Sequence, residues 1–112
     1  MKIYHNPRCS KSRQALNILQ EKGIELEVVE YLKTPPTKEE LTQVLKKLNL
    51  SPQEIIRKGE AEFKEHYKGK EFTDEEWIEI LVNTPRLIER PIVITEQKAV
   101  VARPPEKVSE LL

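Results

Sequence analysis

The chain begins with KIYHNPRCSKSRQALNILQEKGIELEVVEY, residues 2–31, and this stretch decides the fold. Its first residues predict a short strand, which Asn6-Pro7 ends. Residues 10–22 predict a helix, and the alternating, then β-branched run at residues 24–31 predicts a second strand. A strand, a helix and a strand in this order form a βαβ unit, in which the strands are parallel and the crossover is right-handed.

Cys9 is the only cysteine of the chain and lies at the junction between the first strand and the helix. There the sulfur would face the unpaired backbone N–H groups and the positive dipole end of the helix, which lower the pKa of a thiol. Arg8, Lys11 and Arg13 add positive charge around it. The position therefore predicts a nucleophile. Free cysteines are also among the most buried residue types, so an inert core thiol is the alternative.

Length and composition limit the classes of function. A chain of 112 residues is expected to form one domain whose core needs no disulfide or metal. Charged residues make up 34% of the chain and cancel to a net charge of zero, which argues against nucleic acid as a partner. A local cationic pocket for a small anion remains compatible with that balance.

Several kinds of site are not expected. One cysteine and two histidines, His5 and His66, make no convincing set of metal ligands, and the three glycines cannot build a phosphate-binding loop. No apolar run is long enough to span a membrane. We expect a cytoplasmic location, because the thiol is unpaired and no export signal is evident, and a monomer, because no exposed apolar stripe is evident.

The middle of the chain, about residues 37–83, predicts a helical insertion in the same domain. Its helices begin at recognisable capping signals: Thr37 with Glu40, Ser51-Pro52, and Thr73 with Asp74-Glu75-Glu76. Trp77, at helical spacing with its apolar neighbours, is expected to pack in a core. Residues 92–95 predict a buried strand, residues 99–101 pair back on it, and Pro104-Pro105 begins a last helix. The expected fold is a single α/β domain over residues 1–112, a mixed sheet in the order β-α-β … β-β-α.

The chain also resembles a known family in three segments. These are HNPRCSKSR at residues 5–13, Arg90-Pro91-Ile92-Val93 and Arg103-Pro104-Pro105-Glu106, with further likeness at residues 31–37 and 50–58. They resemble the glutaredoxin-coupled arsenate reductase (ArsC) family, which has a thioredoxin-like fold. The resemblance implies that Cys9 attacks arsenate as the thiolate, that Pro91 is a cis proline, and that three arginines hold the oxyanion: Arg57, Arg90 and Arg103.

The residue types suit this chemistry. A planar guanidinium donates two parallel hydrogen bonds to a tetrahedral oxyanion. Arg90 and Arg103 are expected to converge, because one precedes the buried strand and the other follows its hairpin partner. Arg57 lies in the less constrained helical segment. Any one of them, taken alone, could be an ordinary surface charge.

Three residues near Cys9 are expected to support it. Ser12 lies one helical turn on and either donates its hydroxyl to the sulfur or is plain helix surface. His5 either bonds to backbone or supports the thiolate electrostatically, and Arg13 is expected to give local electrostatic support. Because residue 12 is serine, no intramolecular disulfide can form, and the second reducing thiol must come from glutathione or a glutaredoxin-like protein.

The expected function is the reduction of arsenate to arsenite, with glutathione as co-substrate and no tightly bound cofactor. Two alternatives remain open. One is a glutathione-dependent thiol reductase that acts on mixed disulfides, with the arginines binding the carboxylates of glutathione. The other is a non-enzymatic, Spx-like regulator of the same fold. Such regulators typically carry a Cys-x-x-Cys switch, which Ser12 interrupts here.

Overall fold

The computed structural model describes all 112 residues, Met1–Leu112. The chain forms two compact units. The sheet unit comprises Met1–Thr34 and Arg90–Leu112, and the helical unit comprises Pro35–Glu89. The helical segment that the sequence predicts at about residues 37–83 therefore extends a little further at both ends.

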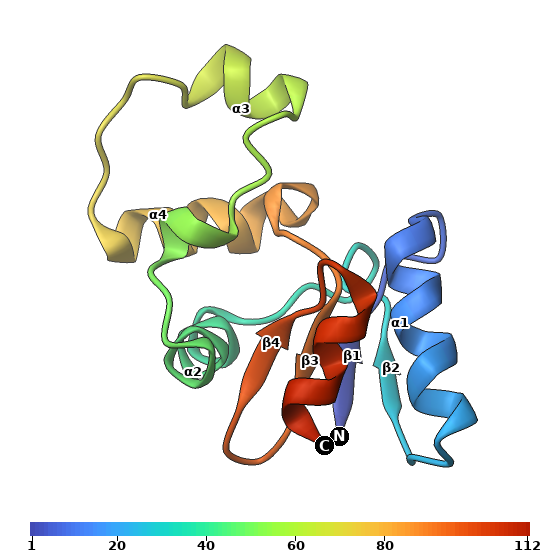
Figure 1. The fold of residues 1–112 in the computed structure, drawn as a ribbon. Helices are drawn as coiled ribbons and strands as arrows, with labels where there is room; N and C mark the ends of the chain where they lie inside the picture. Colours follow the sequence, from blue (N-terminus) through green and yellow to red (C-terminus); the bar gives the residue numbers. More distant parts are fainter. The chain divides into compact units, whose positions relative to one another are not determined.

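The sheet unit carries four strands in the order β2-β1-β3-β4 (Figure 1). β1 pairs in parallel with β2, and the other two pairs are antiparallel. The mixed sheet and its βαβ start are those that the sequence predicts, and the thioredoxin-like α/β fold is confirmed. The elements of this unit are β1 (Lys2–Tyr4), α1 (Ser10–Glu21), β2 (Glu27–Val29), β3 (Ile92–Ile94), β4 (Ala99–Val101) and the 3-10 helix η3 (Pro105–Leu111).

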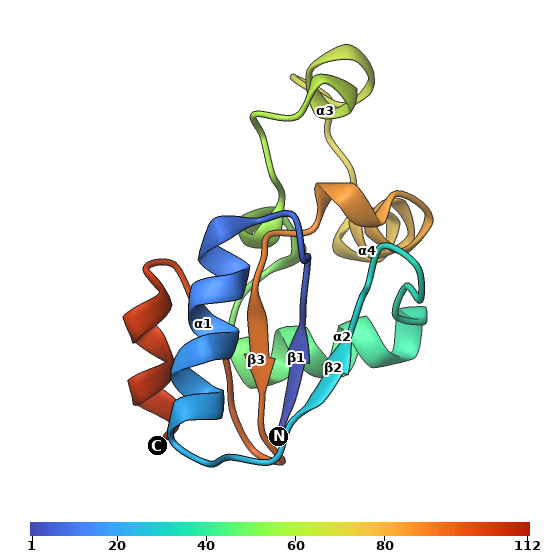
Figure 2. The same cartoon turned by 90° about the vertical axis from the view of Figure 1, so that its right-hand side faces the viewer.

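One face of this sheet is covered by α1 and η3, which lie side by side (Figures 1 and 2). Ala15 and Leu19 lie one turn apart on α1 and are completely buried. They form one core cluster with Ile3 of β1, Val93 of β3 and Val108 of η3. Full burial of a Leu, Ile or Val side chain contributes roughly 1.5–3 kcal/mol, so this cluster anchors α1 on the sheet.

Two elements differ from the sequence prediction. β2 covers only Glu27–Val29 and not residues 24–31, because β1 has just three residues and its register pairs Lys2 with Glu27 and Tyr4 with Val29. Ile24 and Leu26 pack against the core cluster instead of pairing. The last element, η3, is a 3-10 helix in place of the α-helix that we expected.

The helical unit is built from α2 (Lys38–Leu48), η1 (Pro52–Ile55), α3 (Ala61–His66), α4 (Asp74–Asn83) and η2 (Pro85–Leu87). Both predicted capping boxes form, Thr37 with Glu40 and Thr73 with Glu76. α2 packs on α4, and Trp77 of α4 is buried as predicted. None of the helices has both the length and the apolar character needed to cross a membrane.

Candidate active site

The strand register brings three chain segments, from both parts of the sheet unit, to the same end of the sheet. Tyr4, the last residue of β1, pairs with Ile92, the first residue of β3, and Ile92 also pairs with Val101, the last residue of β4. The loop after β1 carries Cys9, the segment before β3 carries Arg90, and the segment after β4 carries Arg103. All three residues therefore leave the sheet at the same end.

Cys9 is the N-cap residue of α1 and is partly exposed. Its side chain makes no capping hydrogen bond of ordinary geometry. Burial raises the pKa of the Cys9 thiol, but the backbone N–H of Ser12, the charge of Arg90, the backbone N–H of Lys11 and a hydrogen bond from Arg90 outweigh it. The net result is a pKa below that of an ordinary thiol, as the sequence predicts for a nucleophile at a helix start. The sulfur is not sealed in the core.

Arg90 is the arginine that the structure brings to Cys9. Its guanidinium both hydrogen-bonds to the sulfur and lowers the pKa of the Cys9 thiol by its charge. Arg103 reaches the same end of the sheet, where its Nη1 donates to the carbonyl oxygen of Arg90 at 3.2 Å. The Arg103 guanidinium is thus held against the backbone of Arg90, the residue whose side chain acts on the thiol. The peptide bond between Arg90 and Pro91 is cis.

Ser12 is fully buried, and its hydroxyl is engaged away from the sulfur. Its Oγ lies 2.7 Å from Nδ1 of His5 and accepts a hydrogen bond from the backbone N–H of Asn6 at 3.0 Å. Ser12 acts on Cys9 through its backbone N–H and not through the hydroxyl. The hydroxyl instead ties the loop that follows β1 to the first turn of α1.

His5 and Arg13 complete the support of this loop. Burial lowers the pKa of His5, the Glu30 charge raises it and Arg13 lowers it, with a net shift downward. A neutral imidazole is therefore favoured, and it positions Ser12 instead of supplying positive charge to the sulfur. Arg13 donates from Nη1 to the carbonyl oxygen of Pro7 at 2.8 Å, which fixes the other side of the loop.

Arg57 belongs to the helical unit, where its side chain is held by two neighbours. Its Nη2 lies 2.8 Å from Oε1 of Glu60, and its Nη1 donates to the carbonyl oxygen of Arg86 at 3.3 Å. The Arg86 side chain is itself paired with Glu62. The convergence of Arg57 on the oxyanion stays a prediction.

Sequence reasoning missed two contributors. Asn6 gives its backbone N–H to Ser12, and its side-chain oxygen accepts from the backbone N–H of Arg8 at 3.0 Å. An Asn-Pro pair predicts a turn, but it does not predict which groups will form hydrogen bonds with the turn. Glu60 was missed as the partner of Arg57, although a carboxylate three residues after an arginine is a recognisable ion-pair signal.

The pKa of Cys9 gives the first prediction. Alkylation by iodoacetamide needs the thiolate, so its rate should rise with pH through a midpoint below that of an ordinary thiol and then level off. Arg90→Ala removes one group that lowers this pKa in two ways, by its charge and by its hydrogen bond, so the midpoint should move to higher pH. Arg8→Ala, a charge change next to Cys9 at an arginine that is not among the groups shifting its pKa, serves as the control. Equal midpoints for Arg90→Ala and the native protein would contradict the assignment.

The buried hydroxyl of Ser12 gives the second prediction. Ser12→Ala leaves Nδ1 of His5 and the N–H of Asn6 without their partner, which should cost about 1–3 kcal/mol of unfolding free energy. Urea denaturation measures it. The exposed Ser10→Ala should stay within about 0.5 kcal/mol of the native protein. A loss no larger for Ser12→Ala than for Ser10→Ala would show that the hydroxyl does not hold the loop.

Comparison with known proteins places this site in a family. The model of the ArsC family matches residues 4–111. The chain is 46% identical to the "Uncharacterized protein YfgD" of Escherichia coli strain K12, over 100% of this chain and 96% of the relative. It is 42% identical to an arsenate reductase of Neisseria meningitidis serogroup A, over 100% of this chain and 97% of the relative. A solved arsenate reductase from Vibrio cholerae superposes with a TM-score of 0.94 at 40% identity, covering 100% of this chain and 98% of that one. The chain therefore belongs to the ArsC family, as its sequence led us to expect.

Proposed function

We propose that this protein reduces arsenate to arsenite through one nucleophilic cysteine and an external thiol. The observation that carries the proposal is the partly exposed Cys9 at the N-terminus of α1. The Arg90 guanidinium hydrogen-bonds to its sulfur. A thiolate beside a cation is reactive towards a soft, electron-poor centre, and the cation also attracts the anion that carries this centre. The arsenate reductases among the relatives support the choice of substrate.

The reaction would proceed in three steps. The Cys9 thiolate attacks arsenic and a protonated oxygen leaves as water, which gives a sulfur–arsenic(V) bond. The thiolate of glutathione then attacks the Cys9 sulfur, and the electron pair of the sulfur–arsenic bond passes to arsenic. Arsenite leaves, and a mixed disulfide between Cys9 and glutathione remains, which a glutaredoxin-like protein would reduce. The two thiols supply the two electrons that arsenic gains.

The arginines would bind the oxyanion and neutralise the charge that develops on its oxygens. Arg90 serves twice in this scheme, because the same group that stabilises the thiolate also neighbours the incoming anion. Residue 12 is a serine and Cys9 is the single cysteine, so the intermediate must be attacked by a thiol from outside the chain. Phosphate has nearly the shape of arsenate, and since phosphorus is harder to reduce it should act only as a competitive inhibitor.

Substitution of the site residues tests the proposal. Cys9→Ser should abolish arsenate-dependent oxidation of NADPH in an assay coupled through glutathione, glutaredoxin and glutathione reductase. Arg90→Ala and Arg103→Ala should each lower kcat/KM by about 10²–10³. The exposed Arg86→Ala is the matched control and should retain the native rate. An unchanged rate for Cys9→Ser would overturn the proposal.

The same assay separates arsenate reduction from the thiol-reductase alternative. A glutathionylated model disulfide, offered in place of arsenate, should turn over more slowly than arsenate at equal concentration. Rapid reduction of this disulfide with no arsenate turnover would show that the protein is a thiol reductase that acts on mixed disulfides.

The ion pair between Glu60 and Arg57 makes it possible to test whether Arg57 binds the oxyanion without removing the arginine. If Arg57 binds the oxyanion, the anion must displace the Glu60 carboxylate, which occupies the same guanidinium. Glu60→Gln should then lower the KM for arsenate by up to about five-fold, the most that an ion pair near the surface typically contributes. Glu62→Gln breaks the neighbouring pair with Arg86 and should leave KM unchanged. An unaltered KM in both Glu60→Gln and Arg57→Ala would exclude Arg57 from the oxyanion site.

A further inference from the structure

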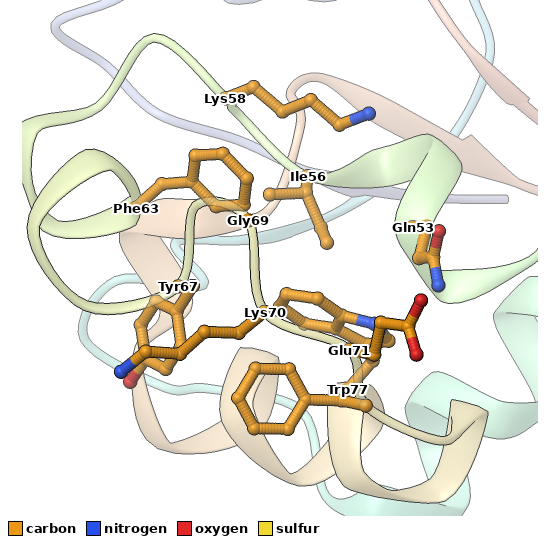
Figure 3. A pocket seen from close by; sticks show the side chains of 10 residues that line it. Gln53, Ile56, Lys58, Phe63, Tyr67, Gly69, Lys70, Glu71 and Trp77 are labelled. Carbon is orange, nitrogen blue, oxygen red and sulfur yellow. The ribbon is translucent and has the colours of Figure 1, made fainter.

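The helical unit contains a cavity of about 430 Å³ that the arsenate chemistry does not use. Its size lies within the range of roughly 300–1,000 Å³ that is typical of small-molecule sites. Four of the ten residues that line it are aromatic (Figure 3). They come from α3, from the loop before α4 and from α4 itself: Phe63, Tyr67, Phe72 and Trp77.

Trp77 is the centre of this aromatic cluster. The Phe72 ring meets it edge to face with centroids 4.8 Å apart, and the Tyr67 and Phe63 rings lie at 6.1 and 6.5 Å. These spacings suit favourable aromatic pairs. The Trp77 ring is buried, whereas the other three rings are half-buried. Apolar ring surface is therefore left open towards the cavity.

The indole N–H of Trp77 has no hydrogen-bond partner, although only 4% of the residue is exposed. A buried donor without an acceptor costs about 1–3 kcal/mol, and native structures rarely keep one. In Figure 3 the indole nitrogen lies on the side of the cavity that carries Gln53 and Glu71. The missing group is a hydrogen-bond acceptor, such as a carboxylate or carbonyl oxygen.

The charged groups around the cavity have both signs. Lys58 and Lys70 contribute ammonium groups and Glu71 contributes a carboxylate. Lys70 extends beside Tyr67, whereas Glu71 projects on the opposite side, beside Gln53 (Figure 3). A ligand with a negative and a positive group next to each other would offer an acceptor to the indole N–H and a cation to Glu71, and an apolar part could pack on the rings.

We propose that this cavity binds a small α-amino acid with an apolar side chain. The ligand carboxylate accepts from the Trp77 indole N–H. The ligand ammonium pairs with Glu71, and the apolar side chain packs on the half-buried rings. The site is separate from Cys9 in its chemistry, because it lacks a nucleophile.

The single tryptophan of the chain makes a direct test available, because its indole N–H gives one resonance in a ¹H–¹⁵N spectrum. L-phenylalanine should shift this resonance saturably. 3-Phenylpropionate, which lacks the amine, should do so with lower affinity, and phenethylamine, which lacks the carboxylate, should leave it in place. No saturable shift with L-phenylalanine, or equal shifts with all three compounds, would overturn the proposal.

A variant assigns the ammonium end of the ligand. Glu71→Gln should weaken L-phenylalanine but not 3-phenylpropionate. Lys64→Met, on α3 but outside the cavity lining, is the control and should change neither. If Glu71→Gln moves the free indole resonance as far as saturating L-phenylalanine does, Glu71 is itself the acceptor and the proposal fails.

Discussion

The charge on the Cys9 sulfur depends on a balance between burial and positive partners. Partial burial opposes ionisation, because a thiolate loses hydration as it leaves water. The N–H groups of the first turn of α1 and the Arg90 guanidinium supply favourable electrostatics in return. The balance lowers the pKa of the Cys9 thiol, and the first step of the proposed chemistry uses the thiolate as its nucleophile.

The sheet supplies the geometry that this balance requires. β1 delivers Cys9 to the start of α1, and the antiparallel pairing of β1 with β3 delivers Arg90 to the same end. A shift of this register by one residue would turn the side chains of β3 to the opposite face and expose part of its buried Ile-Val-Ile run. The core cluster therefore fixes the site indirectly, because it fixes the register.

Much of this arrangement could be predicted from particular residues. Asn6-Pro7 before Cys9 located the junction of strand and helix, and the boxes at Thr37 and Thr73 located the helix starts. These are local signals, which a sequence carries within a few positions. The length of β2 was not predictable in this way, because it depends on the three residues that β1 offers for pairing.

The remaining errors concern groups far apart in sequence. Ser12 was expected either to bond Cys9 or to lie on the surface, but its buried hydroxyl bonds to His5, seven positions away and from another element. Which partner a buried polar group finds depends on how two elements pack, and periodicity does not encode it. The carbonyl oxygen of Arg86, 29 positions from Arg57, is likewise a hydrogen-bond partner that no local pattern predicts.

The bond between the Cys9 sulfur and arsenic is tested most directly by arsenic K-edge X-ray absorption. The native protein is saturated with arsenate in the absence of any other thiol. A bond between Cys9 and arsenic should add a sulfur neighbour to the oxygen shell of arsenic, and this neighbour should vanish in Cys9→Ser. An arsenic shell made only of oxygen in the native protein would contradict the account.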